Sequence, residues 1–418
     1  MLTYYWPPSG GSGVQRWVYF CYYLKKLGWE PIVITVAPEK ASYPQTDNTL
    51  AALVTDIKLI RTYTHEPLRW YSRYVGSGSI PQGEVPQKNV VQKIAAFIRG
   101  NFFVPDARKG WIPFAQGALK SILQEEKPAW VVSTGPPHST HLAVLPLKKK
   151  YTFKWLVDFR DPWTEVFYNR HLYRLSSTQR KDKALEKLVL QAADTVLTTV
   201  GGEFHKQLLN QAPKQRFVAL ANGYDADKLK VLNRQSNAKE FHLVYTGLLT
   251  RNQAFPALIQ ALQQLKSSLP IRFSLAGQIE ADILTEITES LPNCIVDYKG
   301  YLSHDQALQL MHTADVLVNF IFKRAHSQMV SGKLLEYMAT GVPVLSLGDP
   351  NSEAAALIHK GSAAKMLAAT DTEGIHTFLE RALAQKGAWT NSFPAKEDWS
   401  RERITKQLHS QVLEASTH

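Results

Sequence analysis

Short apolar segments alternate with amphipathic helical segments along almost the whole chain, and this alternation limits the fold more than any other feature. The apolar segments are rich in β-branched or aromatic residues and are bounded by turn residues, as buried strands are. They are residues 31–36, 130–134, 154–158, 194–199, 241–246, 271–276, 314–319 and 343–347. Strands that alternate with helices form parallel sheets covered on both faces. The sequence therefore predicts an α/β protein.

The chain of 418 residues is too long for one ordinary core, so we expect two doubly wound, Rossmann-like domains. Glycines at 201–202 and Asn222-Gly223 interrupt the pattern between the two halves. We place the first domain at residues 1–199 and the second at 200–385. Residues 386–418 contain a last amphipathic helix, which we expect to pack back on the first domain. The first strand is very short, either by truncation or because translation starts upstream.

The net charge of +12 belongs almost wholly to the first half of the chain. Residues 1–200 contain 26 Lys and Arg against 15 Asp and Glu, whereas residues 201–418 contain 22 against 21. Basic and aromatic residues also cluster together at 69–74 and 97–103. This asymmetry is typical of a protein that meets a lipid bilayer or a phosphorylated acceptor, and equally of a solvated basic face. No nucleic-acid-binding motif accompanies the charge, so we expect no nucleic-acid partner.

Other features of the composition exclude whole classes of protein. No run of about 18 uncharged apolar residues occurs, so no transmembrane helix is expected, and the N-terminus lacks the pattern of a secretory signal. The only cysteines, Cys21 and Cys294, lie far apart in the sequence. We therefore expect neither a disulfide framework nor a cysteine metal site, and a cytoplasmic location.

Residues 331–345 (SGKLLEYMATGVPVL) form the strongest chemical motif in the chain. A loop of small residues leads into a helix, and Gly341 and Pro343 end that helix before the next strand. The start of the helix offers free backbone N–H groups to a diphosphate, and Lys333 adds a cation in the first turn. Glu336, one turn further on, could accept hydrogen bonds from a ribose diol. A lone Lys-x-x-Glu would more often be solvated, but the complete motif favours a nucleotide site.

A glycine-rich segment, residues 5–17 (YWPPSGGSGVQRW), precedes another predicted helix. Gly11 and Gly13 would let the backbone approach a phosphate closely. The segment lacks the Gly-Lys-Ser/Thr of a Walker loop. Arg16 stands where a dinucleotide fingerprint needs its third glycine, so bound NAD is not expected. A glycine-rich turn without a ligand is the plain alternative.

Two polar motifs directly follow predicted strands, at residues 133–141 (STGPPHSTH) and 158–163 (DFRDPW). Ligands of open α/β sheets bind beyond the carboxyl ends of strands, so both motifs are well placed. Asp161 and His138 are candidates for contacting the acceptor or the reacting sugar. A local ion-pair network would also explain the acidic and basic residues at 158–161. The spacing of His138 and His141 does not suit metal ligands on one helix face, and we expect no metal.

The motif at 331–345 resembles the donor-binding helix of GT-B glycosyltransferases, particularly the retaining family-four type (glycosyl transferases group 1). In that family a Glu-x7-Glu motif precedes Ala-x-Gly-x-Pro-Val. Glu336 matches the second glutamate, whereas the first falls on Gln328, a neutral amide that both donates and accepts. The strand and turn at 245–252 place Arg251 where the family has a cation for the leaving diphosphate. The lysine that often follows it is Gln253 here.

The resemblance implies a GT-B fold in which two doubly wound, Rossmann-like domains face a cleft. It implies catalytic roles for Arg251 and Lys333, to which the strand-end positions of Asp161 and His138 add those two residues as catalytic candidates. The donor-binding residues that it implies are Gly11, Gly13, Arg251, Gln328, Val330, Ser331, Gly332, Lys333 and Glu336. It identifies no cofactor beyond the nucleoside-diphosphate-sugar substrate.

The function implied is transfer of a sugar from that donor to a glycan or lipid-linked acceptor, with retention of configuration and without metal, in cell-envelope polysaccharide assembly. The basic first domain would contact the inner membrane face peripherally. A GT-B-like sugar-nucleotide epimerase, or a non-catalytic subunit that only binds the sugar nucleotide, are the alternatives. Turnover of the donor with and without an acceptor separates the three.

Overall fold

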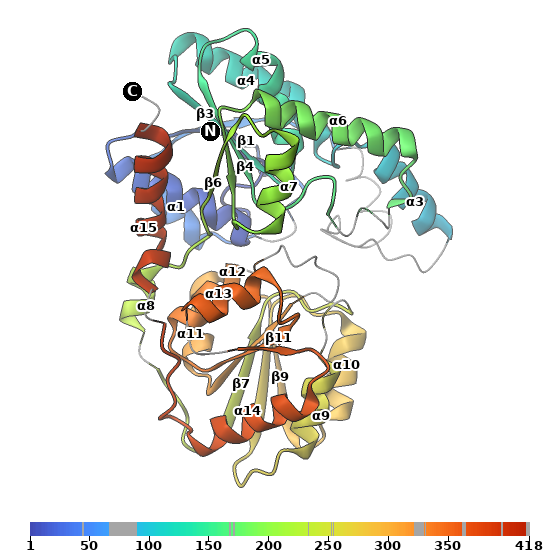
Figure 1. Cartoon of the computed structure of the whole chain (residues 1–418), viewed down its shortest axis with the longest axis vertical. Coiled ribbons are helices and arrows are strands. Elements are labelled where there is room, and N and C mark those ends of the chain that lie inside the picture. The colour runs from blue at the N-terminus through green and yellow to red at the C-terminus, as the bar shows by residue number, and fades with distance from the viewer. Residues whose placement is uncertain are drawn as a thin grey trace. The chain divides into compact units, whose positions relative to one another are not determined.

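The computed structural model describes residues 1–43, 46–66, 90–166, 169, 172–232, 234–251, 253, 255–321, 330, 332–361, 365–393 and 396–414. The chain forms two compact units (Figure 1). Unit 1 consists of Met1–Asn222 with Ile404–His418, and unit 2 is Gly223–Arg403. The boundary expected between residues 199 and 200 lies inside unit 1, because the strand at 216–219 still pairs within the unit 1 sheet.

Unit 1 contains a parallel sheet. Its strands are β1 (Ile32–Val36), β2 (Lys58–Thr62), β3 (Trp130–Gly135), β4 (Lys154–Phe159), β5 (Thr195–Thr198) and β6 (Arg216–Ala219). β2 pairs with β1, and β3 to β6 pair in chain order. Leu2 makes parallel bridges to Ile34 of β1 and Ser133 of β3. The short first segment therefore lies between β1 and β3 and joins the two groups of strands.

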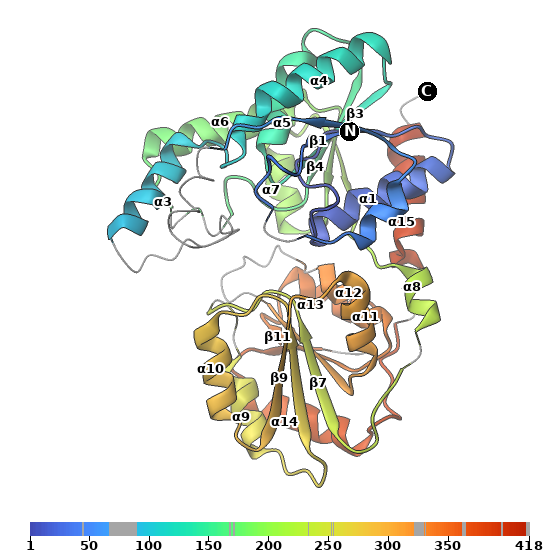
Figure 2. The same cartoon turned by 180° about the vertical axis from the view of Figure 1, so that it is seen from behind.

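Helices cover both faces of this sheet (Figures 1 and 2). They are α1 (Ser12–Lys26), α3 (Val90–Phe102), α4 (Ile112–Glu125), α5 (Ser139–Lys148), α6 (Ser176–Ala192), α7 (Glu203–Gln211) and α15 (Arg401–Leu408). Side chains alternate along each strand, so the sheet has two cores. Val157 packs with residues of α4, α5, α6 and α7 on one face. Leu156 packs with residues of α1 on the other face, together with Ile404 and Leu408 of α15.

The irregular helical segments of the chain are short. η1 (Thr49–Val54), η2 (Lys109–Trp111) and η4 (Lys396–Trp399) are 3₁₀ helices, and a π-helical segment, η5 (His409–Glu414), follows α15. In the described parts of both units, no helix has the length and apolar character required to cross a bilayer.

Unit 2 contains a second parallel sheet with the strand order β12-β11-β10-β7-β8-β9. The strands are β7 (Phe241–Thr246), β8 (Ile271–Ala276), β9 (Cys294–Gly300), β10 (Val316–Phe320), β11 (Val344–Gly348) and β12 (Met366–Ala368). The chain starts at β7, adds β8 and β9 on one side, and then crosses to add β10 on the other. Ligands of doubly wound sheets bind where the strand order reverses, so a site is expected at the carboxyl ends of β7 and β10.

The helices of unit 2 complete a doubly wound domain around this sheet. They are α8 (Ala226–Val231), α9 (Pro256–Gln264), α10 (Ala281–Ser290), α11 (His304–His312), α12 (Gly332–Ala339), α13 (Glu353–Gly361) and α14 (Thr372–Ala384). α9 and α14 pack against one core with β7, β8 and β10, and α11 and α12 contribute to another. The predicted α/β architecture is confirmed in both units.

A buried ion pair joins several elements of unit 1. The side chains of Arg16 in α1 and Asp158 in β4 are both fully buried, with 3.2 Å between Nη2 and Oδ1. Asp158 also accepts hydrogen bonds from Trp17 Nε1 at 2.6 Å and Thr134 Oγ1 at 2.8 Å. Arg16 Nη1 donates to the Leu220 carbonyl at 2.9 Å. Both charges are thus satisfied by several groups, which compensates for their removal from water.

We predict that Asp158→Asn destabilises unit 1 by about 3 kcal/mol, because it leaves the buried Arg16 guanidinium without a counter-charge. Thermal unfolding followed by scanning calorimetry measures the effect. Glu126→Gln is the control, since the ion pair of Lys58 and Glu126 is solvent-exposed and should contribute little. Equal melting temperatures for Asp158→Asn and the parent would contradict the importance of this ion pair.

Candidate functional site

The first turn of α12 lies against the end of β7. Lys333 Nζ donates to the Thr246 carbonyl at 2.8 Å and lies 3.8 Å from the centre of the Tyr245 ring. In the same helix, the Tyr337 hydroxyl accepts a hydrogen bond from Thr246 N at 2.8 Å. α12 therefore holds both polar groups of the Thr246 peptide, and it fixes the Lys333 ammonium at the point where the strand order of the sheet reverses.

Burial lowers the pKa of Lys333 to about 7. The side chain is half-buried, and no carboxylate of the described residues contacts its ammonium. The charged form loses hydration and gains only a carbonyl and an aromatic ring in return. An anionic group bound beside Nζ would reverse this balance and favour the ammonium. Among the described residues, Lys333 is thus a cation without a carboxylate partner.

Two glycines leave the backbone bare next to this ammonium. Gly247 has φ of +124°, and a Cβ atom at that position would lie 3.3 Å from Lys333 Nζ. Gly277, after β8, has φ of +120°, and its Cβ would lie 2.2 Å from the Gly247 carbonyl oxygen. Both positions adopt a conformation that favours glycine. The ends of β7 and β8 therefore come close together only because neither residue has a side chain.

Glu336 lies one turn further along α12 and is 7% exposed. His304 Nε2 donates to its Oε1 at 2.8 Å, and Arg401 Nη2 donates to the same oxygen at 3.0 Å. Burial alone would raise the pKa of Glu336, but the charges and hydrogen bonds of His304 and Arg401 outweigh it and lower the pKa below its ordinary value. Glu336 is thus an ionised acceptor, and the hydrogen bonds from His304 Nε2 and Arg401 Nη2 both go to Oε1, not to Oε2.

Arg251 is exposed and faces α10. Its guanidinium donates to Asp282 at 3.1 and 3.0 Å and also pairs with Glu286. The Arg251 guanidinium therefore contacts α10 and not the Thr246 carbonyl, to which Lys333 donates. Exposed ion pairs of this kind contribute little and exchange readily.

Gln253 stands where the family often has a lysine, but its side chain is only 2% exposed. Its Oε1 accepts from Thr250 N at 2.7 Å, and its Nε2 donates to the Leu248 carbonyl at 2.6 Å. The amide thus braces the turn that follows β7. A lysine could not supply the oxygen that accepts from Thr250 N.

The other residues predicted for the donor precede α12. Gln328 and Ser331 lie outside the described residues. Val330 is half-buried, and Gly332 begins α12.

In unit 1 the predicted residues gather at the carboxyl edge of the sheet. Gly11 has φ of +103° and directly precedes α1. A Cβ at Gly13 would lie 1.8 Å from Arg160 Nη1, so the guanidinium packs directly on this glycine. Arg160 Nε also donates to the Gly135 carbonyl at 3.2 Å. Arg160, which the sequence did not single out, therefore links the glycine-rich loop to the ends of β3 and β4.

His138 and Asp161 both lie near this arginine. The His138 ring stacks on Trp163 with 4.9 Å between centroids, and its Nδ1 has no hydrogen-bond partner among the described residues. Burial, helped by the charge of Arg160, lowers the pKa of His138 to about 3, so the ring is neutral. Burial raises the pKa of the half-buried Asp161 carboxyl, although Arg160 opposes the shift. A neutral His138 can accept or donate a hydrogen bond but is not a general acid.

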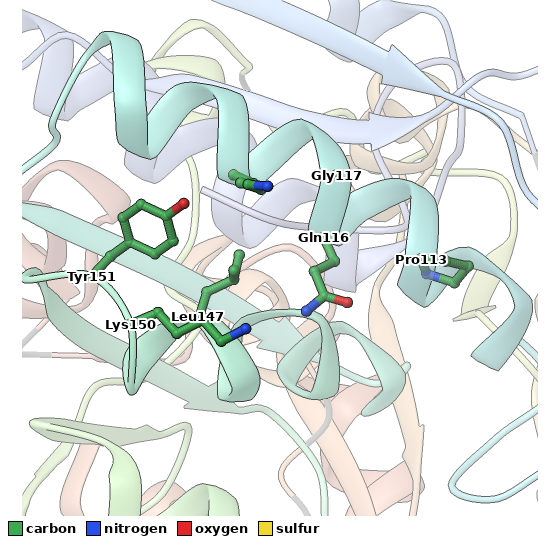
Figure 3. A pocket seen from close by; sticks show the side chains of 7 residues that line it. Pro113, Gln116, Gly117, Leu147, Lys150 and Tyr151 are labelled. Atoms are coloured by element: carbon green, nitrogen blue, oxygen red, sulfur yellow. The ribbon is translucent and has the colours of Figure 1, made fainter.

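A hollow of about 560 Å³ lies elsewhere on unit 1, between α4 and the end of α5 (Figure 3). Its lining residues are Pro113, Gln116, Gly117, Lys120, Leu147, Lys150 and Tyr151. None of them belongs to the predicted site. Across the described ranges, no three His, Cys, Asp or Glu residues are grouped as metal ligands.

Sequence reasoning missed His304 and Arg401, the two partners of Glu336. Ser303 and Gln306 form a capping box that marks the start of α11, so the position of His304 at a helix start was readable. Its contact with Glu336 was not, because 32 residues separate them. Arg401 is 65 residues from Glu336, at the start of α15, and nothing local signals that contact.

Comparison with known proteins supports the interpretation of unit 2. The family model for glycosyl transferases group 1 matches residues 240–385. A search of curated protein sequences finds no match.

Solved structures resemble the whole chain. Sucrose-phosphate synthase from Thermosynechococcus elongatus has a TM-score of 0.62 at 15% identity, covering 95% of this chain and 92% of that one. Anabaena HepE in complex with UDP-glucose has a TM-score of 0.59 at 12% identity, covering 99% and 98%. The lipopolysaccharide outer core galactosyltransferase WaaB has a TM-score of 0.58 at 12% identity, with the same coverage.

At these identities the solved structures establish the fold, and the family match places the glycosyltransferase signature in unit 2. That unit is also the one that holds Lys333 and Glu336 at the reversal of its strand order. The chain is therefore a glycosyltransferase of the GT-B fold, with a glycosyl transferases group 1 domain at residues 240–385.

Proposed function

We propose that the enzyme transfers a sugar from a nucleoside-diphosphate-sugar to a glycan or lipid-linked acceptor, with retention of configuration and without metal. One observation carries the proposal. At the reversal of strand order in unit 2, the Lys333 ammonium lies beside bare glycine backbone, with the ionised Glu336 one turn away on the same helix. A cation and a carboxylate at this spacing match the diphosphate and the ribose of one nucleotide.

The diphosphate would lie at the start of α12, where free N–H groups and the helix dipole favour an anion. Lys333 supplies the nearby charge, and Arg251 could join it by leaving its exposed carboxylate partners on α10. Glu336 would accept from the ribose diol through Oε2, since His304 and Arg401 already hold Oε1. Gln328, Val330, Ser331 and Gly332 would line the path between diphosphate and sugar. HepE is solved with UDP and UDP-glucose, so uridine nucleotides are the first donors to test.

The residues proposed to contact the acceptor lie at the carboxyl edge of the sheet in unit 1. The bond from the anomeric carbon to the diphosphate breaks, and negative charge builds on the diphosphate. The acceptor oxygen bonds to that carbon, and the proton of the acceptor hydroxyl passes to the departing diphosphate oxygen. Stabilising that charge is the main catalytic task, and it needs no covalent nucleophile. His138 would accept a hydrogen bond from a sugar or acceptor hydroxyl through its unpartnered Nδ1. Asp161 would contact the same groups, and Gly11 and Gly13, at the start of α1, would face the donor diphosphate.

With such an acceptor, the enzyme would act in cell-envelope polysaccharide assembly. A lipid-linked acceptor would lie at the inner membrane face, and the basic excess of residues 1–200 suits an anionic surface there. The enzyme would thus be cytoplasmic and peripherally bound to the membrane.

We predict that Glu336→Gln weakens binding of uridine diphosphate roughly tenfold or more, because a neutral amide replaces the charged acceptor of the ribose hydroxyls. Isothermal titration calorimetry of the full chain measures the dissociation constant. Glu373→Gln, at an exposed position of α14, is the matched control and should bind as the parent does. Unchanged affinity in Glu336→Gln would remove Glu336 from the donor site.

We predict that donor affinity falls as the pH rises above 7. Lys333 has a pKa of about 7 in the free protein, and a bound diphosphate raises it. Binding therefore takes up a proton above pH 7, and affinity should decline by up to about tenfold per pH unit until the pKa of the complex is reached. Below pH 7, Lys333 is protonated in both the free protein and the complex, so it adds no pH dependence to the donor affinity. The probe is uridine diphosphate glucose, titrated in buffers of different ionisation enthalpy.

Two variants test the source of this pH dependence. Lys333→Met should bind more weakly and lose the slope, whereas Lys365→Met, at an exposed position, should retain it. A slope that persists in Lys333→Met would assign the proton to another group.

We predict that Asp161→Asn lowers the rate at which diphosphate is released from the matching sugar nucleotide by at least about tenfold, with little effect on uridine diphosphate binding. A lower reaction rate with unchanged uridine diphosphate binding is expected for a residue that contacts the sugar or the acceptor and not the nucleotide. Glu165→Gln, which changes an exposed neighbour paired with Lys183, is the control. A rate within a few-fold of the parent would exclude Asp161 from catalysis.

A further inference from the structure

Helix α3 exposes a continuous apolar stripe. Val90 is 70% exposed, Ile94 54%, Ile98 42% and Phe102 63%. These residues are spaced four apart, so they lie along one face of the helix. Single exposed apolar side chains are ordinary, but four in a row on one helix face mark an interaction surface.

The opposite side of α3 is firmly packed on unit 1. Ala96 is fully buried, and a Cβ at Gly100 would lie 2.3 Å from the Leu172 carbonyl oxygen. Asn101 Oδ1 accepts from Leu175 N at 2.8 Å and from Thr178 Oγ1 at 2.9 Å. The helix is thus docked by one face while its apolar stripe points away from the core.

Exposed apolar residues continue beyond the C-terminal end of the stripe. Tyr173 is 44% exposed and Leu175 is 51% exposed. Asn101 in the last turn of α3 joins both to the helix, because its Nδ2 donates to the Tyr173 carbonyl at 3.1 Å. α6 begins directly afterwards, so the C-terminal end of α3 lies beside the start of α6, and the two helices diverge from there (Figures 1 and 2).

The charged residues of α3 are all cations. The helix contains Lys93 and Arg99 and no acidic residue, and with 3.6 residues per turn these cations fall on the two flanks of the stripe. On α6 the exposed charged residues are Arg180, Lys181, Lys183 and Lys187, and of these Lys183 is paired with the exposed Glu165. The two carboxylates of α6, Asp182 and Glu186, are buried, and Asp182 is paired with Arg174.

We propose that the α3 surface, namely Val90, Ile94, Ile98, Phe102, Tyr173 and Leu175, docks this enzyme on an anionic lipid bilayer. An apolar face flanked by cations is the arrangement of helices that lie in the membrane interface. The stripe would enter the boundary between headgroups and acyl chains, and the cations of α3 and α6 would contact lipid phosphates. A second copy of the chain would bring the same cations together, so like-charge repulsion disfavours it as the occupant.

The inference deepens the membrane contact in the proposed function and is independent of the donor chemistry. The test is co-sedimentation of the full chain with vesicles of phosphatidylcholine, with or without phosphatidylglycerol, at low salt. The parent should pellet only with the anionic vesicles. The double variant Ile94→Gln with Ile98→Gln should lower the partition coefficient by roughly tenfold or more, because both side chains lose their transfer into the interface. Val231→Gln, at a position 80% exposed in unit 2, is the matched control and should pellet like the parent.

Calorimetric titration of uridine diphosphate into the same proteins separates this inference from the proposed function. Loss of pelleting in the double variant supports the docking surface whether or not the nucleotide binds. A parent chain that fails to pellet with anionic vesicles overturns it, even if the nucleotide binds. So does a double variant that pellets normally. A dimer of the parent in lipid-free solution that the double variant abolishes also overturns it, because the stripe would then join two copies.

Discussion

The proposed donor site depends on how the backbone N–H and carbonyl of Thr246, at the end of β7, satisfy their hydrogen bonds. β10 pairs with β7 only at Leu243 and Val244, so the last peptide of β7 has no strand partner on that side. A buried peptide group without a partner is costly, and two side chains of α12 fill the gap: the Tyr337 hydroxyl takes the N–H and the Lys333 ammonium takes the carbonyl. The same two contacts fix the rotation of α12 and thereby the direction of Glu336. Because β7 extends beyond its pairing with β10, its last residue fixes the positions of Lys333 and Glu336 on α12.

The sequence allowed us to predict those strands and site residues that a local sequence pattern marks. Central strands were visible because both of their faces are buried, whereas the edge strands β2, β6, β9 and β12 were not among the predicted segments. All four are partly exposed, β2, β6 and β9 contain charged residues, and β12 has only three residues, so the apolar signal is weak. Glu336 was identified from its motif, yet its partners His304 and Arg401 come from distant elements and carry no local signal. In the sequence, Gln253 stands where the family often has a lysine. The structure shows that its amide instead hydrogen-bonds to Thr250 N and to the Leu248 carbonyl, and so stabilises the turn after β7.

The glycine-rich loop of unit 1 shows how one pattern can have two physical explanations. From the sequence, Gly13 permits close approach of a phosphate. In the structure the guanidinium of Arg160 already lies against it, so any larger residue there would displace the arginine. Arg16 likewise occupies the position where a dinucleotide-binding fingerprint would have its third glycine. In the structure it is the buried ion-pair partner of Asp158. Arg16 and Arg160 therefore contribute to the packing of unit 1. The count of basic residues in the first half of the chain did not show this.

The weakly basic Lys333 has a consequence for the end of the catalytic cycle. A permanently charged guanidinium at this position would hold the departing nucleoside diphosphate as firmly after the reaction as during it. An ammonium with a pKa of about 7 can instead lose its proton to solvent once the anion begins to leave. In the proposed donor site, its electrostatic attraction for the product would then weaken as the product moves away, so the burial that lowers the pKa of Lys333 would also favour product release.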